Sequence, residues 1–188
     1  MNMETKKAIE EMGSKKNLQE IYKTFLEAEL DVLRKADEGK ETIVALKEEL
    51  AEAQGFRKKK DNSPDTAQIS TTALKGAIAV MSGDPDKISD EKTMQEDYIR
   101  LVKEEKIDKD FFLSYREKEE KAKRAKEEIK EKKNELCEQY DKKIVGVIHT
   151  LAKEESKMIK QKEDGKEPKN DTETYEILME IKKELGLK

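Results

Sequence analysis

Cysteine and histidine, the residues that most often carry metal and nucleophilic chemistry, occur once each among the 188 residues of this chain. A single cysteine, Cys137, forms no intrachain disulfide and supplies no cysteine cluster for a metal ion. A Ser-His-Asp or Cys-His centre would have to use His149, and no catalytic motif surrounds it, so we expect both residues to be packing residues. The sequence also lacks GxGxxG and GK[ST] phosphate loops. We therefore predict that the protein is not an enzyme and uses no metal, cofactor or small-molecule ligand.

Proline and aromatic residues are also scarce, with three prolines, no tryptophan and 5% aromatic residues in all. Few prolines, together with many Glu, Lys, Ala and Leu residues, favour long helices. Charged residues make up 45% of the chain and hydrophobic residues 34%, whereas ordinary globular chains are about 25% charged. We expect long helices that share a narrow apolar stripe, with partial disorder as the alternative.

Long apolar runs are absent, and none approaches the roughly 20 residues that cross a bilayer. The first residues are polar and charged, unlike a signal peptide. The amphipathic segments have polar faces of mixed charge, which suit helical partners better than lipid. The net charge is −4, from 40 basic and 44 acidic residues, which argues against a protein that coats nucleic acid as a whole. We predict a cytoplasmic protein that does not bind membranes.

Residues 17–54 are predicted to form the first long helix, after a flexible N-terminal segment at residues 1–16. Apolar residues recur there at helical spacing, namely Leu18, Tyr22, Phe25, Val32, Ala36, Ile43, Leu46, Leu50 and Ala53. Glu29 interrupts this stripe, and Gly39 occupies a position on it. The region is either one helix weakened at Gly39 or two helices joined at residues 37–40. The unbroken spacing favours one helix, because a turn has no reason to preserve it.

Residues 55–70 read as a basic and polar linker. The segment contains a cluster formed by Phe56, Arg57, Lys58, Lys59 and Lys60. Four adjacent cations can contact about four phosphates, which gives weak and salt-sensitive binding to nucleic acid. We take these five residues as candidate contacts for a partner protein or a nucleic acid; the alternative is an ordinary solvated loop.

Residues 71–106 are predicted to form two short helices. The first contains the apolar run from Ala73 to Met81. A strand is the alternative for this run, because a short apolar segment cannot be assigned by periodicity alone.

Residues 107–165 are predicted to form one long helix, followed by a C-terminal amphipathic helix at residues 166–188. The interval from residue 116 to residue 133 is almost wholly charged. Leu136, Tyr140 and Ile144 are separated by two successive steps of four, which we interpret as a stutter in the helical repeat.

Apolar density is highest in two segments, Ala73–Met81 and Ile144–Leu151, each of which contains a glycine. We expect these segments and the C-terminal helix to form one compact core, with the charged first half of the long helix paired against residues 17–54. The predicted fold class is therefore all-α, with long helices in an antiparallel coiled-coil-like hairpin attached to a small helical bundle. The candidate helix–helix contacts are Phe25, Leu46, Leu50, Ile78, Ile129, Leu136, Tyr140, Ile144, Val147 and Leu151.

Helices this highly charged bury little apolar surface alone, so a partner or a second copy of the chain is physically useful. Our first functional hypothesis is a non-enzymatic interaction protein (a scaffold, adaptor or inhibitor) that binds another protein or self-associates into an oligomer. The alternative is a nucleic-acid-associated accessory protein that uses the basic residues 56–60. An unrecognised enzyme is a third hypothesis, opposed by the single histidine.

Overall fold

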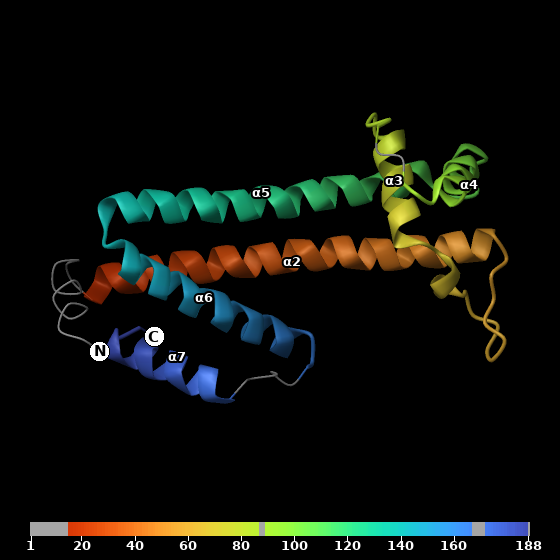
Figure 1. Cartoon of the computed structure of the whole chain (residues 1–188). Coiled ribbons are helices and arrows are strands. Elements are labelled where there is room, and N and C mark those ends of the chain that lie inside the picture. The colour runs from red at the N-terminus through yellow and green to blue at the C-terminus, as the bar shows by residue number, and fades with distance from the viewer. Residues whose placement is uncertain (1–14, 87–88, 167–171, 188) are drawn as a thin grey trace. The chain divides into compact units, whose positions relative to one another are not determined.

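The computed structural model describes residues 15–86, 89–166 and 172–187, and in these ranges the regular structure is helical (Figure 1). The helices are α2 (Lys15–Ala53), the short 3-10 helix η1 (Thr66–Gln68), α3 (Thr71–Met81), α4 (Lys92–Lys103), α5 (Lys109–Gln139), α6 (Lys142–Glu163) and α7 (Thr172–Glu184). The prediction of an all-α fold built from long helices is confirmed. Most of the N-terminal segment predicted to be flexible, residues 1–14, lies outside the described residues, as do the side chains of residues 172–175 and 178. No helix in the described ranges has the length and apolar character needed to cross a membrane.

The chain divides into two compact units. Unit 1 comprises residues 1–34 and 122–188, and unit 2 comprises residues 35–121. Helices α2 and α5 each contribute one segment to each unit, and each unit has its own apolar core.

Unit 2 closes its core with four helical segments. The largest buried side chains in it include Leu46 and Leu50 from α2, Leu74 from α3, Tyr98 from α4 and Phe112 from α5. The run at residues 73–81 is helical, which settles the helix-or-strand alternative in favour of the helix. Its start is fixed by Ser70, whose Oγ accepts a hydrogen bond from the backbone N–H of Ala73 at 3.2 Å. This is the normal N-cap interaction of a serine.

Helix α2 continues through Gly39 without a turn, so the one-helix alternative holds. Within unit 2, α2 and α5 run antiparallel, because Thr42 receives a hydrogen bond from Lys118 at 2.8 Å while Glu49 lies near Asp108. Gly39 is buried, and a methyl group built on it would lie 3.9 Å from the ring of Tyr115. Gly39 therefore faces the Tyr115 ring of α5, and α2 continues through it as a regular helix.

Unit 1 packs the first part of α2 against α6, with the end of α5 and the residues after α7 completing the core. Phe25, Val145 and Ile148 are fully buried, and Leu185 and Leu187 are nearly so. Unit 1 therefore draws on segments from both ends of the described chain.

The prediction of a single helix at residues 107–165 is wrong, because the chain breaks between α5 and α6. Asp141 has a non-helical backbone (φ −59°, ψ 123°), and its Oδ1 accepts hydrogen bonds from the backbone N–H groups of Lys143 at 2.8 Å and Ile144 at 3.1 Å. An aspartate in this position satisfies N–H groups that a continuous helix would have bonded itself. The two steps of four at Leu136, Tyr140 and Ile144 therefore mark a junction between helices, not a stutter.

The prediction that the two densest apolar segments share one core is also wrong. Residues 73–78 belong to the core of unit 2, and residues 144–151 belong to that of unit 1. Gly146 does not mark a close helix approach, since a methyl group built on it meets no described atom within 4 Å. The pairing of the C-terminal residues with α6, through Leu185 and Leu187, is as expected.

Candidate functional site

Helix α6 carries a broader apolar face than the rest of unit 1 covers. One stripe, formed by Val145, Ile148, Ala152 and Ser156, has 0% exposure and faces the core. A second stripe lies beside it, starting at Val147 and continuing one turn later at Leu151. Val147 is 41% exposed, whereas Leu151 is buried. Part of the apolar surface of α6 is therefore left at the protein surface.

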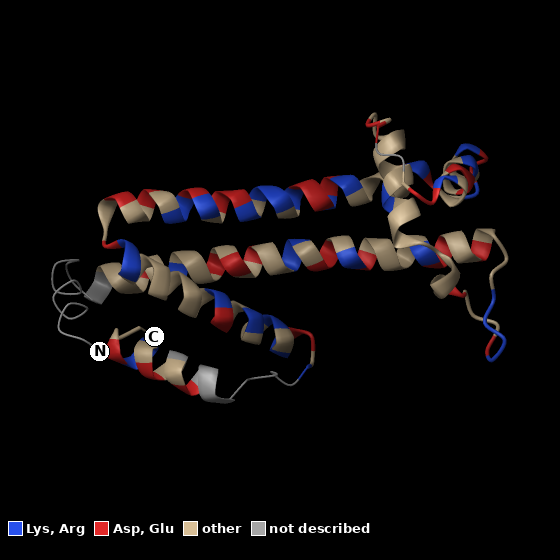
Figure 2. Ribbon diagram, in the orientation of Figure 1, with Lys and Arg blue, Asp and Glu red and all other residues tan. Residues whose placement is uncertain are grey.

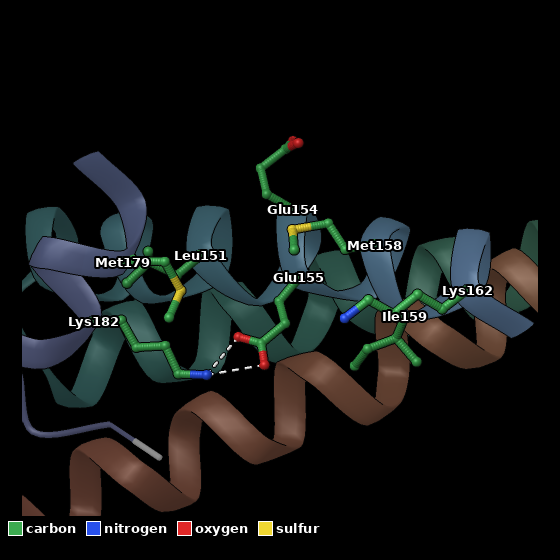
Figure 3. A pocket seen from close by; sticks show the side chains of 8 residues that line it. All are labelled: Leu151, Glu154, Glu155, Met158, Ile159, Lys162, Met179 and Lys182. Carbon is green, nitrogen blue, oxygen red and sulfur yellow. Dashed lines mark hydrogen bonds and ion pairs between the residues drawn. The ribbon is translucent and has the colours of Figure 1, made fainter. Parts of the chain in front are cut away.

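A groove of about 140 Å³ lies between α6 and α7 in unit 1. Its apolar walls come from Leu151, Met158 and Ile159 on α6 and from Met179 on α7, which is itself 41% exposed. Figure 3 shows these side chains together with the four charged residues that line the same groove, Glu154, Glu155, Lys162 and Lys182. The groove thus combines a mainly apolar wall with a few fixed charges, as partner and ligand sites commonly do.

The polar part of the groove is a three-residue network that joins three helices. Lys182 on α7 donates to both carboxylate oxygens of Glu155 on α6, at 2.9 and 2.6 Å. The same carboxylate accepts the hydroxyl hydrogen of Tyr22 on α2, and the Lys182 ammonium lies 5.0 Å from the centre of the Tyr22 ring. Burial, and then the hydrogen bond to Glu155, raise the pKa of the Tyr22 hydroxyl. The network links α7 to α6 and α2, and it satisfies the carboxylate of Glu155 internally.

The two remaining charged residues of the groove differ in their partners. Glu154 forms an ion pair with Lys157 at 2.6 Å. Lys162 is exposed, and its ammonium has no hydrogen bond or ion pair with any residue that the structure describes. Among the described residues, the Lys162 ammonium is therefore the one charge of the groove without a bonded partner.

The basic cluster Phe56–Lys60 lies in unit 2, in a loop that has a defined backbone. Residues 57 and 64 form an isolated antiparallel bridge, and the backbone N–H of Lys58 donates to the carbonyl of Ser63 at 2.9 Å. Asp61 closes the turn by accepting hydrogen bonds from Ser63, which lower the pKa of that carboxyl. We call residues 56–65 the basic turn; it is more ordered than the solvated linker that the sequence suggested.

The cations of the basic turn are not all equally available. Arg57 pairs with Glu52 at 3.0 Å. Lys59 and Lys60 are exposed, and neither pairs with a carboxylate in the described part of the chain. Phe56 is 37% exposed at the base of the turn. Figure 2 shows the basic residues of this loop at the end of α2.

His149 lies in the core of unit 1. Its Nε2 is 2.8 Å from Glu29 Oε1, and its ring packs at a centroid distance of 4.7 Å against Phe25. The two polar side chains are only 16% and 11% exposed. Glu29, which interrupted the stripe in the sequence, is thus the partner of the only histidine. Cys137 is partly buried and packs against the same core.

The ten predicted helix–helix contacts fall into three groups. Seven are buried, namely Phe25, Leu46, Leu50, Ile78, Ile129, Ile144 and Leu151. Leu136 and Tyr140 are partly buried and pack against the core of unit 1. Val147 is the one placed wrongly within the fold, because the core-facing stripe of α6 passes through Ile148 instead.

The groove was not found in the sequence. Of the residues that line it, only Leu151 was among the predicted helix–helix contacts. In a chain that is 45% charged, a glutamate or lysine that enters a buried network has no pattern that separates it from solvated neighbours. The methionines, half-buried Met158 and exposed Met179, were the only available signal, because methionine is common on adaptable binding surfaces.

The described residues contain no group of three or more His, Cys, Asp or Glu side chains arranged to hold a metal ion. Comparison with protein-family models, curated proteins and solved structures found no match for this chain. The function must therefore be argued from the groove and the basic turn themselves.

Proposed function

We propose that this protein acts without catalysis, by binding another protein in the groove between α6 and α7. The observation that carries the proposal is the surplus of apolar surface at the groove and next to it. Met179, which lines the groove, and Val147, one turn before the lining residue Leu151 on α6, are each 41% exposed, while the neighbouring stripe of α6 is closed completely. Apolar surface that gathers at a groove, with charged residues around it, is typical of a protein-interaction site.

The chemistry of the groove supports this role. Methionine side chains are unbranched and polarisable, so Met158 and Met179 adapt to the shape of a bound apolar group. The carboxylate of Glu155 is already engaged by Lys182 and Tyr22, so it is not free to act on a bound molecule. A scaffold, adaptor or inhibitor would use such a surface, and a second copy of this chain is one of the proteins that could fill it.

The test places a charge in the groove. Met179→Glu should abolish co-purification of the cellular partner and should lower any self-association seen by light scattering coupled to size exclusion. Met94→Glu is the matched control, because Met94 is 45% exposed on α4 in unit 2 and lies outside the groove. If both variants retain the same partners and the same mass as the wild type, the proposed function is wrong.

The second candidate is a nucleic-acid-associated accessory function at the basic turn. It is favoured by Lys59 and Lys60, which are exposed and have no carboxylate partner among the described residues. We expect weak binding to DNA or RNA that falls steeply as salt increases, because phosphate contacts release counterions. Replacing Lys58, Lys59 and Lys60 with glutamine should remove it, whereas the same change at Lys126, Lys130 and Lys133 on α5 should not. Absence of binding at about 50 mM salt would eliminate this candidate.

A further inference from the structure

We infer that the groove between α6 and α7 accepts an amphipathic helix of a partner protein, which inserts one large apolar side chain between Met158 and Met179 and places an acidic side chain against Lys162. The inference rests on the proposed function and deepens it, because it specifies the chemistry of the partner. Three observations carry it: the size of the groove, its apolar walls and the charge of Lys162, which has no bonded partner among the described residues.

The size of the groove limits what enters it. Its volume is about 140 Å³. An apolar cavity of about 150 Å³ in another protein accommodates a benzene molecule, so this groove has room for one leucine or phenylalanine side chain. A partner would therefore anchor itself with a single large apolar residue, not with a continuous apolar strip.

The walls favour an apolar anchor because both carboxylates that line the groove are already bonded. Glu155 is held by Lys182 and Tyr22, and Glu154 is held by Lys157. A polar side chain entering between Met158 and Met179 would lose its water contacts without gaining a free partner, which costs free energy. An apolar side chain loses nothing of this kind.

The charge at the end of the groove favours an acidic neighbour. Four charged residues line the groove, and Lys162 is the only one of them that has no bonded partner in the described part of the chain. In Figure 3 its side chain extends beside Ile159, with the ammonium on the side of Glu155. A carboxylate placed there gains a charge-assisted hydrogen bond, and a cation is repelled.

The positions of Met158 and Lys162 fix the spacing of the partner motif. They are four residues apart on α6, which is about 6 Å along the helix axis at 1.5 Å per residue. On a partner helix lying along α6, residues three or four apart are separated by about the same distance. The expected motif is thus a leucine or phenylalanine with an aspartate or glutamate three or four positions away.

The experiment uses the full chain with ¹³C-labelled methionine methyl groups, which give one signal for each of the seven methionines. The probe is an alanine-based helical peptide with one leucine and a glutamate four positions later. Matched peptides carry glutamine in place of the glutamate or alanine in place of the leucine. We expect the leucine–glutamate peptide to shift the Met158 and Met179 signals and the alanine peptide to shift neither.

The charge contact is isolated by a double-mutant cycle. Glutamate to glutamine in the peptide, or Lys162→Gln in the protein, should each weaken binding about threefold, as expected for a partly exposed ion pair. The two changes together should weaken it no further. Lys153→Gln is the control on the same helix, since Lys153 is exposed but does not line the groove.

The outcomes separate the inference from the proposed function. Equal affinity for the glutamate and glutamine peptides would overturn the acidic motif and leave the groove as a protein-binding site. Shifts that arise on concentrating the protein alone would identify a second copy as the occupant and overturn a heteromeric partner. If no peptide at about 1 mM moves either methionine signal, the affinity is weaker than that of even weak specific complexes. Both the inference and the proposed function then fail.

Discussion

Ile148 and Val147 are adjacent in sequence, yet the structure gives them opposite roles. Ile148 has 0% exposure in the core of unit 1, whereas Val147 is 41% exposed. Changing each to alanine therefore tests the assignment of the two stripes of α6 with a pair of closely similar substitutions.

The expected loss for Ile148→Ala follows from its burial. The change removes the equivalent of three buried methylene groups, or about 2.4 kcal/mol at ~0.8 kcal/mol per group. A cavity is left as well, because the four-helix core can relax only partly, so we expect about 3–4 kcal/mol in total, within the usual range of about 2–5 kcal/mol. Val147→Ala loses little buried surface and gains slightly in helix propensity, so its effect should stay within about 0.5 kcal/mol.

The measurement is urea unfolding followed by far-UV circular dichroism. The chain has two units with separate cores, so two unfolding transitions are expected if the units differ in stability. Ile148→Ala should lower the urea midpoint of the unit 1 transition and leave that of unit 2 unchanged. Leu74→Ala, in the core of unit 2, identifies the other transition. Similar changes for Ile148→Ala and Val147→Ala, or a loss below about 1 kcal/mol for Ile148→Ala, would refute the assignment of the two stripes.

Three further predictions concern single features of the fold. Asp141→Ala should destabilise unit 1 by about 1 kcal/mol in the same urea assay, because the N–H groups of Lys143 and Ile144 lose their cap; an unchanged transition would show that the cap is dispensable. Gly39→Ala should raise the thermal midpoint of unit 2, gaining up to about 1 kcal/mol of helix propensity, since the new methyl group would meet Tyr115 at an ordinary 3.9 Å; a lower midpoint would mean that the contact is tighter than it is here. Burial raises the pKa values of Tyr22 and Tyr98 in the folded protein. Their contribution to the free energy of unfolding is therefore complete below the unfolded tyrosine pKa of about 10 and is lost as pH rises above it. In an absorbance titration these two of the five tyrosines should ionise only as the protein unfolds in alkali, and Tyr22→Phe should leave one such tyrosine; five tyrosines that ionise together near pH 10 would contradict the buried network.

The helices were predictable where the evidence is local. The spacing of apolar residues along α2 indicated one helix through Gly39, since a helix keeps its register without knowledge of its neighbours. The break before α6 was missed because it contains no glycine or proline. The only local signal was an aspartate, Asp141, between two steps of four, and in so charged a chain one aspartate is weak evidence for a cap.

The contacts between distant segments were not predictable in the same way. Glu29 and His149 are 120 residues apart, and nothing in either neighbourhood of the sequence indicates that they meet. Glu155 and Lys182 are 27 residues apart, and each looks like any other charged residue of an exposed helix face. Periodicity identifies the buried face of a helix, but it does not identify which residue on another helix completes a polar pair.

The misplacement of Val147 and the existence of the groove have the same physical cause. The apolar residues of α6 form a face that is wider than one stripe, so a single line of three and four steps drawn through Ile144, Val147 and Leu151 follows its edge. The centre of that face, at Val145, Ile148 and Ala152, is the part that unit 1 closes completely. The edge is covered only in part, since Val147 on it remains 41% exposed. A helix whose apolar face exceeds what its own unit covers leaves a surface that a partner can bury, and in unit 1 α6 carries such a surface while the more highly charged α5 does not.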